Sequence, residues 1–480
     1  MNKRLLCHII GNVVRVCGAL MALPIIVSLI LHSGDTMPLL LSMLIALAVG
    51  TALALVQPRR DTLRAREGFA IVAFSWIIVS FLGGLPFYFS GYVPSLVDCF
   101  FETVSGFTTT GATILTDVEA LPKGLLFWRS FTHWAGGMGV LVLSLALIPK
   151  MGARSIHLMR AESPGPSTDK LVPRVANNAK ILYEIYVAIS LFMVAALLFC
   201  GLDLYDALVH MFGAAGTGGF GTYGDSIAHF NSAAVDIVVG VFMALFGVNF
   251  SIYYFLIRRN WKAAFGNSEL RWYVGILLSV SAIIAINIMP LYNGSFFTAL
   301  RYSFFQCSSI MTTTGYATAD FDLWPQLSRV LLVTLMFIGA SAGSTGGGLK
   351  VVRVQLLLKS MVRDIRRTVH PKSVNTVKLD GHTVDESIIS GVQGFFFAYF
   401  LILIVATVIV SLDGFSFETN FTAVIATLSN IGPGLGKVGP TGNFAAFSDL
   451  SKIVLSLCML IGRLEIFPVL MLVSPSAWRK

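Results

Sequence analysis

Long apolar runs alternate with short polar connections along the whole chain. A helix needs about 20 consecutive apolar residues to cross the ~30 Å hydrocarbon core of a bilayer, and runs of roughly that length recur throughout. They lie near residues 8–31, 38–57, 68–90, 124–148, 180–200, 233–257, 272–291, 325–349, 388–412 and 447–474. The pattern predicts an all-α polytopic membrane protein with ten crossing helices.

The composition excludes a water-soluble globule. Of the 480 residues, 55% are hydrophobic and only 12% are charged, and the mean hydropathy is +0.78. The first apolar run follows Lys3 and Arg4 but is long and lacks a small-residue cleavage pattern, so we expect a retained helix and not a signal peptide. The six cysteines show no CxxC spacing, which argues against a disulfide framework and a zinc site.

The basic residues predict the orientation of the chain. Most of the 34 Lys and Arg residues fall in alternate connections, at residues 3–4, 57–67, 149–180, 258–271, 350–386 and 479–480. Because such connections stay on the cytoplasmic side, both termini are expected in the cytoplasm. The other connections are rich in Asp and Glu, which raises the local cation concentration at an outer mouth. The net charge of +9 therefore reflects membrane topology and does not indicate nucleic-acid binding.

One unit occurs four times. "GFTTTGAT" and "MTTTGYAT" share a TTTG element, and "AGTGGFGT" and "SNIGPGLG" are weaker copies; their reference glycines are Gly111, Gly315, Gly219 and Gly432. Before each copy lies a stretch too short to cross a bilayer, roughly at residues 95–107, 203–215, 297–311 and 417–428. Each following apolar run has a glycine at similar depth, namely Gly136, Gly247, Gly339 and Gly462. The predicted unit is a membrane helix, a pore helix, an extended TxG strand and a second membrane helix.

These repeats divide the chain. We expect an extra N-terminal helix pair at residues 1–57, then four pore repeats at residues 58–150, 151–260, 261–375 and 376–480. Non-helical backbone at membrane depth is tolerated only where it lines water or is buried in protein. Four such segments converge best on one aqueous axis, where backbone carbonyls replace the hydration shell of a monovalent cation. The alternative is that the glycines only allow close helix packing and that the threonines satisfy the backbone at kinks.

The motifs resemble those of the Trk/Ktr/HKT superfamily of potassium transporters, and within it the membrane subunit of the bacterial Trk uptake system. The resemblance covers the whole chain and includes "IGRLEIFP" near its end. It implies potassium uptake across the bacterial inner membrane through one selectivity filter, with K⁺ as the transported ion and no cofactor or enzyme activity. On the family pattern the filter residues are Thr109, Thr110, Gly111, Thr217, Gly218, Gly219, Thr313, Thr314, Gly315, Asn430, Ile431 and Gly432.

The segment "GASAGSTGGGLK" at residues 339–350 interrupts an apolar run and cannot be a regular helix, because each glycine costs roughly 1 kcal/mol of helix stability. It resembles the family's intramembrane loop that closes the pore below the filter. The gate residues so implied are Gly339, Gly343, Ser344, Thr345, Gly346, Gly347 and Gly348. A phosphate-binding loop is excluded because Leu349 stands where its lysine belongs. A close-packing seam without a gating role is the alternative.

Arg463 lies in the middle of an apolar run, where a charge is costly and indicates function. We expect it to point into the cavity under the filter and to impose a positive barrier, as the resemblance implies. The alternatives are a carbonyl cap or a pair with Glu465, although residues two apart diverge on a helix. His133 and Trp134 could indicate a proton-linked step, or could simply pack against pore helices.

The basic run from Lys359 to Lys372 could anchor the inner leaflet or serve a cytosolic regulator. The resemblance implies such a partner, a nucleotide-binding TrkA-type ring, bound by a homodimer of the membrane subunit. A symporter that couples K⁺ to H⁺ or Na⁺ is the nearest alternative function. A membrane enzyme is disfavoured because no His, Asp and Glu constellation recurs in the predicted core. A scaffold that only docks a partner leaves the four repeated segments unexplained.

Overall fold

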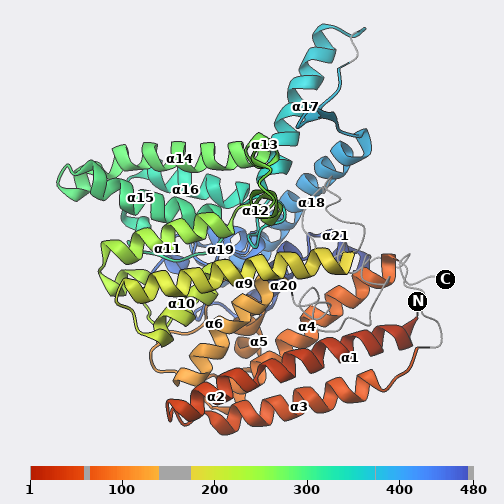
Figure 1. Ribbon diagram of the computed structural model, residues 1–480, viewed down its shortest axis with the longest axis vertical. Helices are drawn as coiled ribbons and strands as arrows, with labels where there is room; N and C mark the ends of the chain where they lie inside the picture. The colour runs from red at the N-terminus through yellow and green to blue at the C-terminus, as the bar shows by residue number, and fades with distance from the viewer. Residues whose placement is uncertain (1, 59–64, 140–174, 373–374, 474–480) are drawn as a thin grey trace.

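The structure is a computed structural model that describes residues 2–58, 65–139, 175–372 and 375–473 (Figure 1). Several predictions fall partly or wholly outside these ranges. They are the end of the apolar run 124–148, parts of the basic connections 57–67 and 149–180, the boundary between residues 150 and 151, and the C-terminal pair 479–480.

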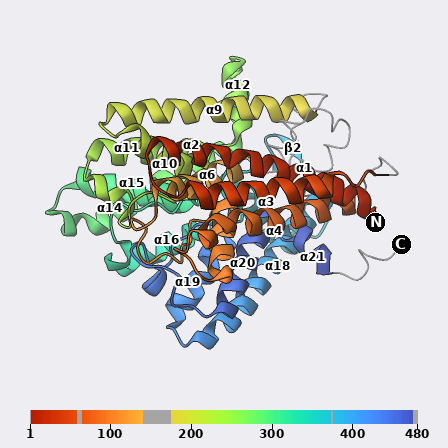
Figure 2. The same cartoon turned by 90° about the horizontal axis from the view of Figure 1, so that it is seen from below.

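Six helices in the described part of the chain are long and apolar enough to cross a membrane. The N-terminal ones are α1 (Lys3–Leu20) with its continuation α2 (Ala22–Ile30), and α3 (Thr36–Ala54). The other four are the first helices of the repeats: α4 (Ala65–Phe89), α9 (Val175–Phe199), α14 (Ser268–Ile288) and α18 (Glu386–Val410). The extra helix pair is thus confirmed, and Figure 2 shows α1 and α3 side by side along α4.

The four pore helices are also confirmed as separate short helices. They are α5 (Leu96–Phe107), α10 (Leu204–Gly216), α15 (Phe296–Met311) and α19 (Phe417–Leu428). Each is capped by a side-chain oxygen that accepts the backbone N–H three residues on; the capping residues are Ser95, Asp203, Ser295 and Ser416. Such caps satisfy amides that a helix start leaves without partners, so each short helix has a defined first residue.

The second helices of the repeats differ in part from the prediction. The apolar runs near 124–148, 233–257 and 447–474 were expected to cross as continuous helices, and this was wrong. In the run 325–349 the helix breaks at the glycine-rich segment 339–350, as predicted. The helices α6 (Lys123–Gly137), α11 (Ala233–Phe246), α16 (Gln326–Ile338) and α20 (Asp449–Arg463) have only 13 to 15 residues. At 1.5 Å per residue they span about 20 Å, too little for a bilayer.

Each of these helices ends within one residue of its repeat glycine. A Cβ on Gly136 would lie 1.9 Å from the carbonyl oxygen of Phe107, and one on Gly462 would lie 2.1 Å from that of Leu428. The glycines therefore let the helix ends touch the ends of the pore helices, and the chain then changes direction. After α11 it bends by 91° into α12 (Phe250–Ile257).

The remaining elements connect these helices. They are α13 (Trp261–Gly266), α17 (Val351–Val369), α21 (Phe467–Val473), the strands β1 (Lys378–Leu379) and β2 (His382–Thr383), and the 3₁₀ turns Ser226–Phe230, Met289–Tyr292, Phe321–Leu323, Ser411–Asp413 and Gly436–Val438. The two strands pair as an antiparallel hairpin. Figure 1 shows α17 extending away from the helix bundle.

The repeats pack in a closed cycle. The second helix of each repeat contacts the pore helix of the next: α6 packs on α10, α11 on α15, α16 on α19, and α20 on α5. The last of these contacts joins the fourth repeat to the first. The fold therefore encloses one central axis on which all four pore helices converge.

Candidate ion-conduction site

The four pore helices end in the same backbone motif. A residue with a positive φ ends each pore helix: 57° at Thr217, which is the C-cap of α10, and 56° at Thr109, 60° at Thr313 and 57° at Asn430, which each follow the C-cap. The N–H of the following residue donates to the carbonyl five residues back, at 2.9 Å for Thr110 and 2.8 Å for Gly218, Thr314 and Ile431. This is the Schellman pattern, which normally carries glycine at the left-handed position. A threonine there is strained, so its surroundings must hold it.

Two residues further on, each predicted filter glycine again has a positive φ: 80° at Gly111 and Gly219, 83° at Gly315 and 97° at Gly432. A Cβ on each would collide with a carbonyl oxygen of the next repeat. The distances are 1.9 Å from Gly111 to Gly218, 2.2 Å from Gly219 to Thr314, 2.1 Å from Gly315 to Ile431 and 2.6 Å from Gly432 to Thr110. The contacts run from the first repeat to the fourth and back to the first. The twelve predicted residues thus form one closed ring of four strands.

The hydroxyls of Thr110 and Thr314 form hydrogen bonds that stabilise this ring. The Thr110 hydroxyl lies 2.8 Å from that of Thr108, and the Thr314 hydroxyl lies 2.7 Å from that of Thr312. Asn430 Nδ2 also donates to Thr110 Oγ1 at 2.9 Å, which ties the fourth strand to the first. The geometry thus engages the Thr110 and Thr314 hydroxyls with protein groups. Thr108 and Thr312 were not predicted, although they are the first threonine of each TTTG.

The second strand departs from TTTG because a histidine fills the space. A Cβ on Gly218 would lie 2.4 Å from Cγ of His133, and the imidazole Nδ1 lies 2.7 Å from the Gly106 carbonyl oxygen. The His133 ring also lies 4.1 Å from the Phe220 ring, centroid to centroid. His133 therefore packs between pore helix α5 and the second strand, which fits the packing interpretation of this residue.

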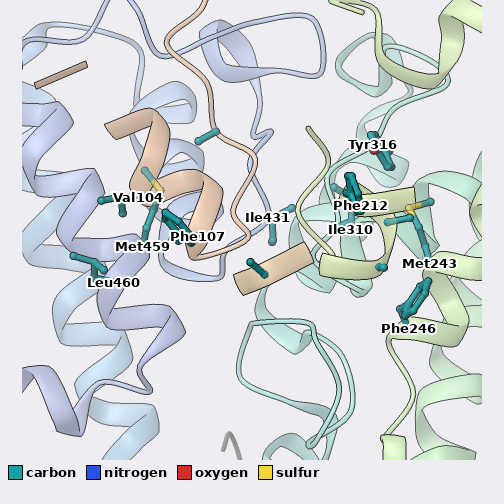
Figure 3. Close-up of a cluster of buried hydrophobic side chains, with 14 of the residues drawn as sticks. Val104, Phe107, Phe212, Met243, Phe246, Ile310, Tyr316, Ile431, Met459 and Leu460 are labelled. Atoms are coloured by element: carbon teal, nitrogen blue, oxygen red, sulfur yellow. The ribbon is translucent and has the colours of Figure 1, made fainter. Parts of the chain in front are cut away.

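Apolar side chains surround the ring on its outer side. Figure 3 shows Ile431 between two groups of buried side chains, the first from α5 and α20 and the second from the second and third repeats. The first group is Val104, Phe107, Met459 and Leu460; the second is Phe212, Met243, Phe246, Ile310 and Tyr316. Close packing of this kind resists displacement, so it holds the strained strands in place.

The glycine-rich loop, residues 339–350, lies directly against the ring where the pore helices end. Gly347 N–H donates to Thr313 Oγ1 at 2.7 Å. A Cβ on Gly346 would lie 2.7 Å from the Thr312 carbonyl oxygen, and one on Gly347 would lie 2.4 Å from that of Ser429. The loop thus fits under the third and fourth strands only because these positions lack side chains.

The break between α11 and α12 holds the glycine-rich loop from the second repeat. Ser341 N–H donates to the Gly247 carbonyl at 3.1 Å, and Thr345 Oγ1 donates to the Phe246 carbonyl at 3.3 Å. In return, Phe250 N–H donates to the Gly343 carbonyl at 3.0 Å. The broken second helices therefore supply free backbone groups that position the loop.

Arg463 joins the glycine-rich loop to the first repeat. Its guanidinium donates to the Thr345 carbonyl at 2.8 Å, to the Gly137 carbonyl at 2.6 Å and to the Gly136 carbonyl. Glu465 pairs with Arg353 and not with Arg463. The geometry therefore fits the carbonyl-capping alternative, with the Arg463 charge beside the glycine-rich loop, and Glu465 is used by Arg353 instead.

Two ion pairs that the sequence interpretation missed involve acidic residues of pore helix α5. Arg129 Nε lies 2.6 Å from Glu102 Oε1 with both side chains buried, and Arg129 stacks 3.5 Å from the Phe220 ring centroid. Lys452 Nζ lies 2.6 Å from Asp98 Oδ1. Arg129 and Lys452 each lie within a predicted apolar run, and that position was the available signal. Part of the acidic charge expected at the outer mouth is thus neutralised.

Comparisons with known proteins agree over most or all of the chain. A family model described as TrkH, cation transport protein, matches residues 37–480. The Trk system potassium uptake protein TrkH of Salmonella typhimurium is 39% identical, and that of Escherichia coli K12 is 38% identical, each over 100% of both chains. The crystal structure of the potassium transporter TrkH from Vibrio parahaemolyticus matches with a TM-score of 0.90 and 33% identity, over 100% of both chains. The chain therefore belongs to the TrkH family of cation transport proteins.

Proposed function

We propose that this protein takes up potassium across the bacterial inner membrane, and that the four-stranded ring is its selectivity filter. The observation that carries the proposal is the closed cycle of contacts in which each filter glycine meets a carbonyl oxygen of the next repeat. The relatives named above are potassium uptake proteins by their descriptions. The ion-facing residues are the same twelve that the family pattern indicates, from Thr109 to Gly432.

Selection would follow from the backbone. A cation that enters the ring exchanges water for carbonyl oxygens, and the pore helices direct the negative ends of their dipoles to the same point. Glycine at the third position of all four strands favours K⁺ on the family pattern. Membrane voltage supplies about 2.3 kcal/mol per charge per 100 mV, which is a sufficient driving force for uptake.

Gating would belong to the glycine-rich loop and Arg463. The loop touches the ring through Gly347, and Arg463 adds a positive charge beside it while holding its Thr345 carbonyl. Both would have to move before a hydrated cation could leave the ring. With the termini in the cytoplasm, as the basic connections indicate, α17 would carry its basic residues to a cytosolic TrkA-type ring. Assembly as a homodimer is part of this proposal.

The test is ion flux in proteoliposomes. Purified wild-type protein is expected to take up ⁸⁶Rb⁺ along an imposed voltage and to prefer K⁺ over Na⁺. The reversal potential should follow the K⁺ gradient alone, because the proposal contains no coupled ion. Absence of flux would refute the proposal, and a reversal potential that follows a pH or Na⁺ gradient would favour the symporter.

A further inference from the structure

One carboxylate holds both ends of the segment that contacts the ring. Glu269, at the start of α14, accepts the N–H of Ala342 at 2.6 Å and the N–H of Val352 at 3.3 Å, both through Oε1. Glu269 is only 6% exposed. The residues that touch the ring and Arg463, from Thr345 to Gly347, lie between these two anchor points. Glu269 therefore closes residues 342–352 into a stapled loop.

The hydrogen bonds to Glu269, which we call the staple, replace a missing helix cap. Lys350 is the N-cap residue of α17, but it has a φ of 70° and its side chain caps no backbone amide. Val351 N–H finds the Ala340 carbonyl at 3.0 Å, whereas Val352 N–H uses Glu269. A carboxylate at a helix N-terminus also interacts favourably with the helix dipole. The start of α17 thus depends on a residue from another helix.

The same point of α14 is tied to the β-hairpin. Ser268, which precedes Glu269, donates its N–H to Asp380 Oδ1 at 2.8 Å, and Asp380 lies in the hairpin turn. A small apolar cluster, separate from the main core, joins the hairpin to the starts of α17 and α18, and Ala342 packs against it. Its buried members are Val352, Leu356, Val377, Val384, Ile389 and Val392. The hairpin, the start of α14 and both ends of the staple therefore form one connected unit.

We infer that Glu269 is a positioning residue that keeps the glycine-rich loop closed against the ring and couples the loop to the β-hairpin. This inference rests on the proposed role of the loop as the gate. If the hairpin moves, Ser268 and the cluster that contains Val352 move with it, because both contact the hairpin. Glu269 follows Ser268 directly, so it shifts both ends of the loop at the same time. Loss of the carboxylate removes one anchor from both ends at once.

The test compares initial ⁸⁶Rb⁺ uptake rates of full-length variants in proteoliposomes. We expect Glu269→Ala to raise the rate about tenfold, equivalent to about 1.4 kcal/mol in the closed-to-open equilibrium. Glu269→Gln should raise it less, because the amide oxygen still accepts an N–H. Asp380→Ala should raise it modestly and add nothing to Glu269→Ala in the double variant. The control is Glu184→Ala, since the Glu184 side chain is 62% exposed and pairs only at 3.7 Å with Lys180.

A second measurement separates gating from folding. Each variant should keep the wild-type preference for K⁺ over Na⁺, because a loosened loop leaves the ring intact. A Glu269→Ala rate at or below that of wild type overturns the inference while wild-type flux still supports potassium uptake. Should Glu269→Ala fail to reconstitute, unchanged rates in both Glu269→Gln and Asp380→Ala overturn it. Wild-type protein without flux overturns the inference and the proposed function together.

Discussion

The second strand of the ring has Gly218 where the first and third strands have Thr110 and Thr314. His133 occupies the space that a threonine side chain would need, since it lies 2.4 Å from the position of a Gly218 Cβ. The imidazole cannot withdraw easily, because Gly106 and Phe220 hold it on two sides. A residue in the first repeat thus determines which residue the second repeat can carry.

Gly218→Ala should therefore cost about 1–3 kcal/mol of stability through overpacking, and should lower the K⁺ over Na⁺ preference. His133→Ala in the same chain should recover part of both losses, because it opens the space that the methyl group needs. Thermal melting in detergent and competition of Na⁺ with ⁸⁶Rb⁺ uptake measure the two effects. Gly224→Ala is the control, since nothing lies within 4 Å of its Cβ position. Strictly additive effects of the two substitutions would contradict the steric explanation.

Gly315 shows a second requirement of the strands besides space, namely a left-handed backbone conformation. Its φ is 83°, and a Cβ there would lie 2.1 Å from the Ile431 carbonyl oxygen. Gly315→Ser should displace that oxygen and cost about 1–2 kcal/mol in backbone strain alone. We expect selectivity for K⁺ over Na⁺ to fall, as measured by reversal potentials under mixed-ion gradients. Gly275→Ser, on α14 with open space around its Cβ position, should leave selectivity unchanged.

At the scale of elements, the pore helices and the break at the glycine-rich loop were predictable, whereas the breaks in the other three second helices were not. A pore helix is marked by a Ser or Asp cap, a length too short to cross and a TxG strand, all of which are local features. No local sequence signal marks the end of α20, because apolar residues continue beyond Arg463. The chain turns at Glu465 and Ile466, both with a φ of 61°. Tertiary hydrogen bonds from Arg463 to the first repeat accompany that turn, and a hydropathy pattern cannot predict such bonds.

In the proposed gating, Arg463 would combine two effects, a charge barrier and a clamp on the glycine-rich loop, and one pair of variants separates them. Arg463→Ala removes both, so its basal ⁸⁶Rb⁺ uptake should exceed that of wild type. Arg463→Lys keeps the charge but cannot reach the Thr345, Gly136 and Gly137 carbonyls in the same forked geometry. If the clamp dominates, Arg463→Lys should conduct nearly as well as Arg463→Ala. Uptake at the wild-type rate in Arg463→Lys would instead assign the effect to charge.

At the scale of the whole molecule, one chain must close a ring that separate subunits close by symmetry in an oligomer. Each joint of the ring is a contact between the second helix of one repeat and the pore helix of the next. Three joints connect consecutive repeats, whereas the fourth packs α20 against α5, which lie at opposite ends of the sequence. The repeat period read from the sequence predicted a ring, because four re-entrant segments need one aqueous axis. The sequence did not indicate which residues close the ring. Closure depends on polar pairs between residues more than 300 positions apart, such as Asn430 with Thr110.

Lys452 and Asp98 form the ion pair at this closing joint, with Nζ and Oδ1 2.6 Å apart and side chains 7% and 22% exposed. Lys452→Met leaves the Asp98 carboxylate without its cation, so it should destabilise the protein by about 1–3 kcal/mol. Because the joint also aligns the fourth strand with the first, selectivity for K⁺ should fall with the melting temperature. Adding Asp98→Asn removes the unpaired charge and should restore most of the melting temperature. Lys180→Met, at an exposed i,i+4 pair, should change neither quantity. A Lys452→Met protein with wild-type melting and selectivity would show that apolar packing of α20 on α5 closes the ring without this pair.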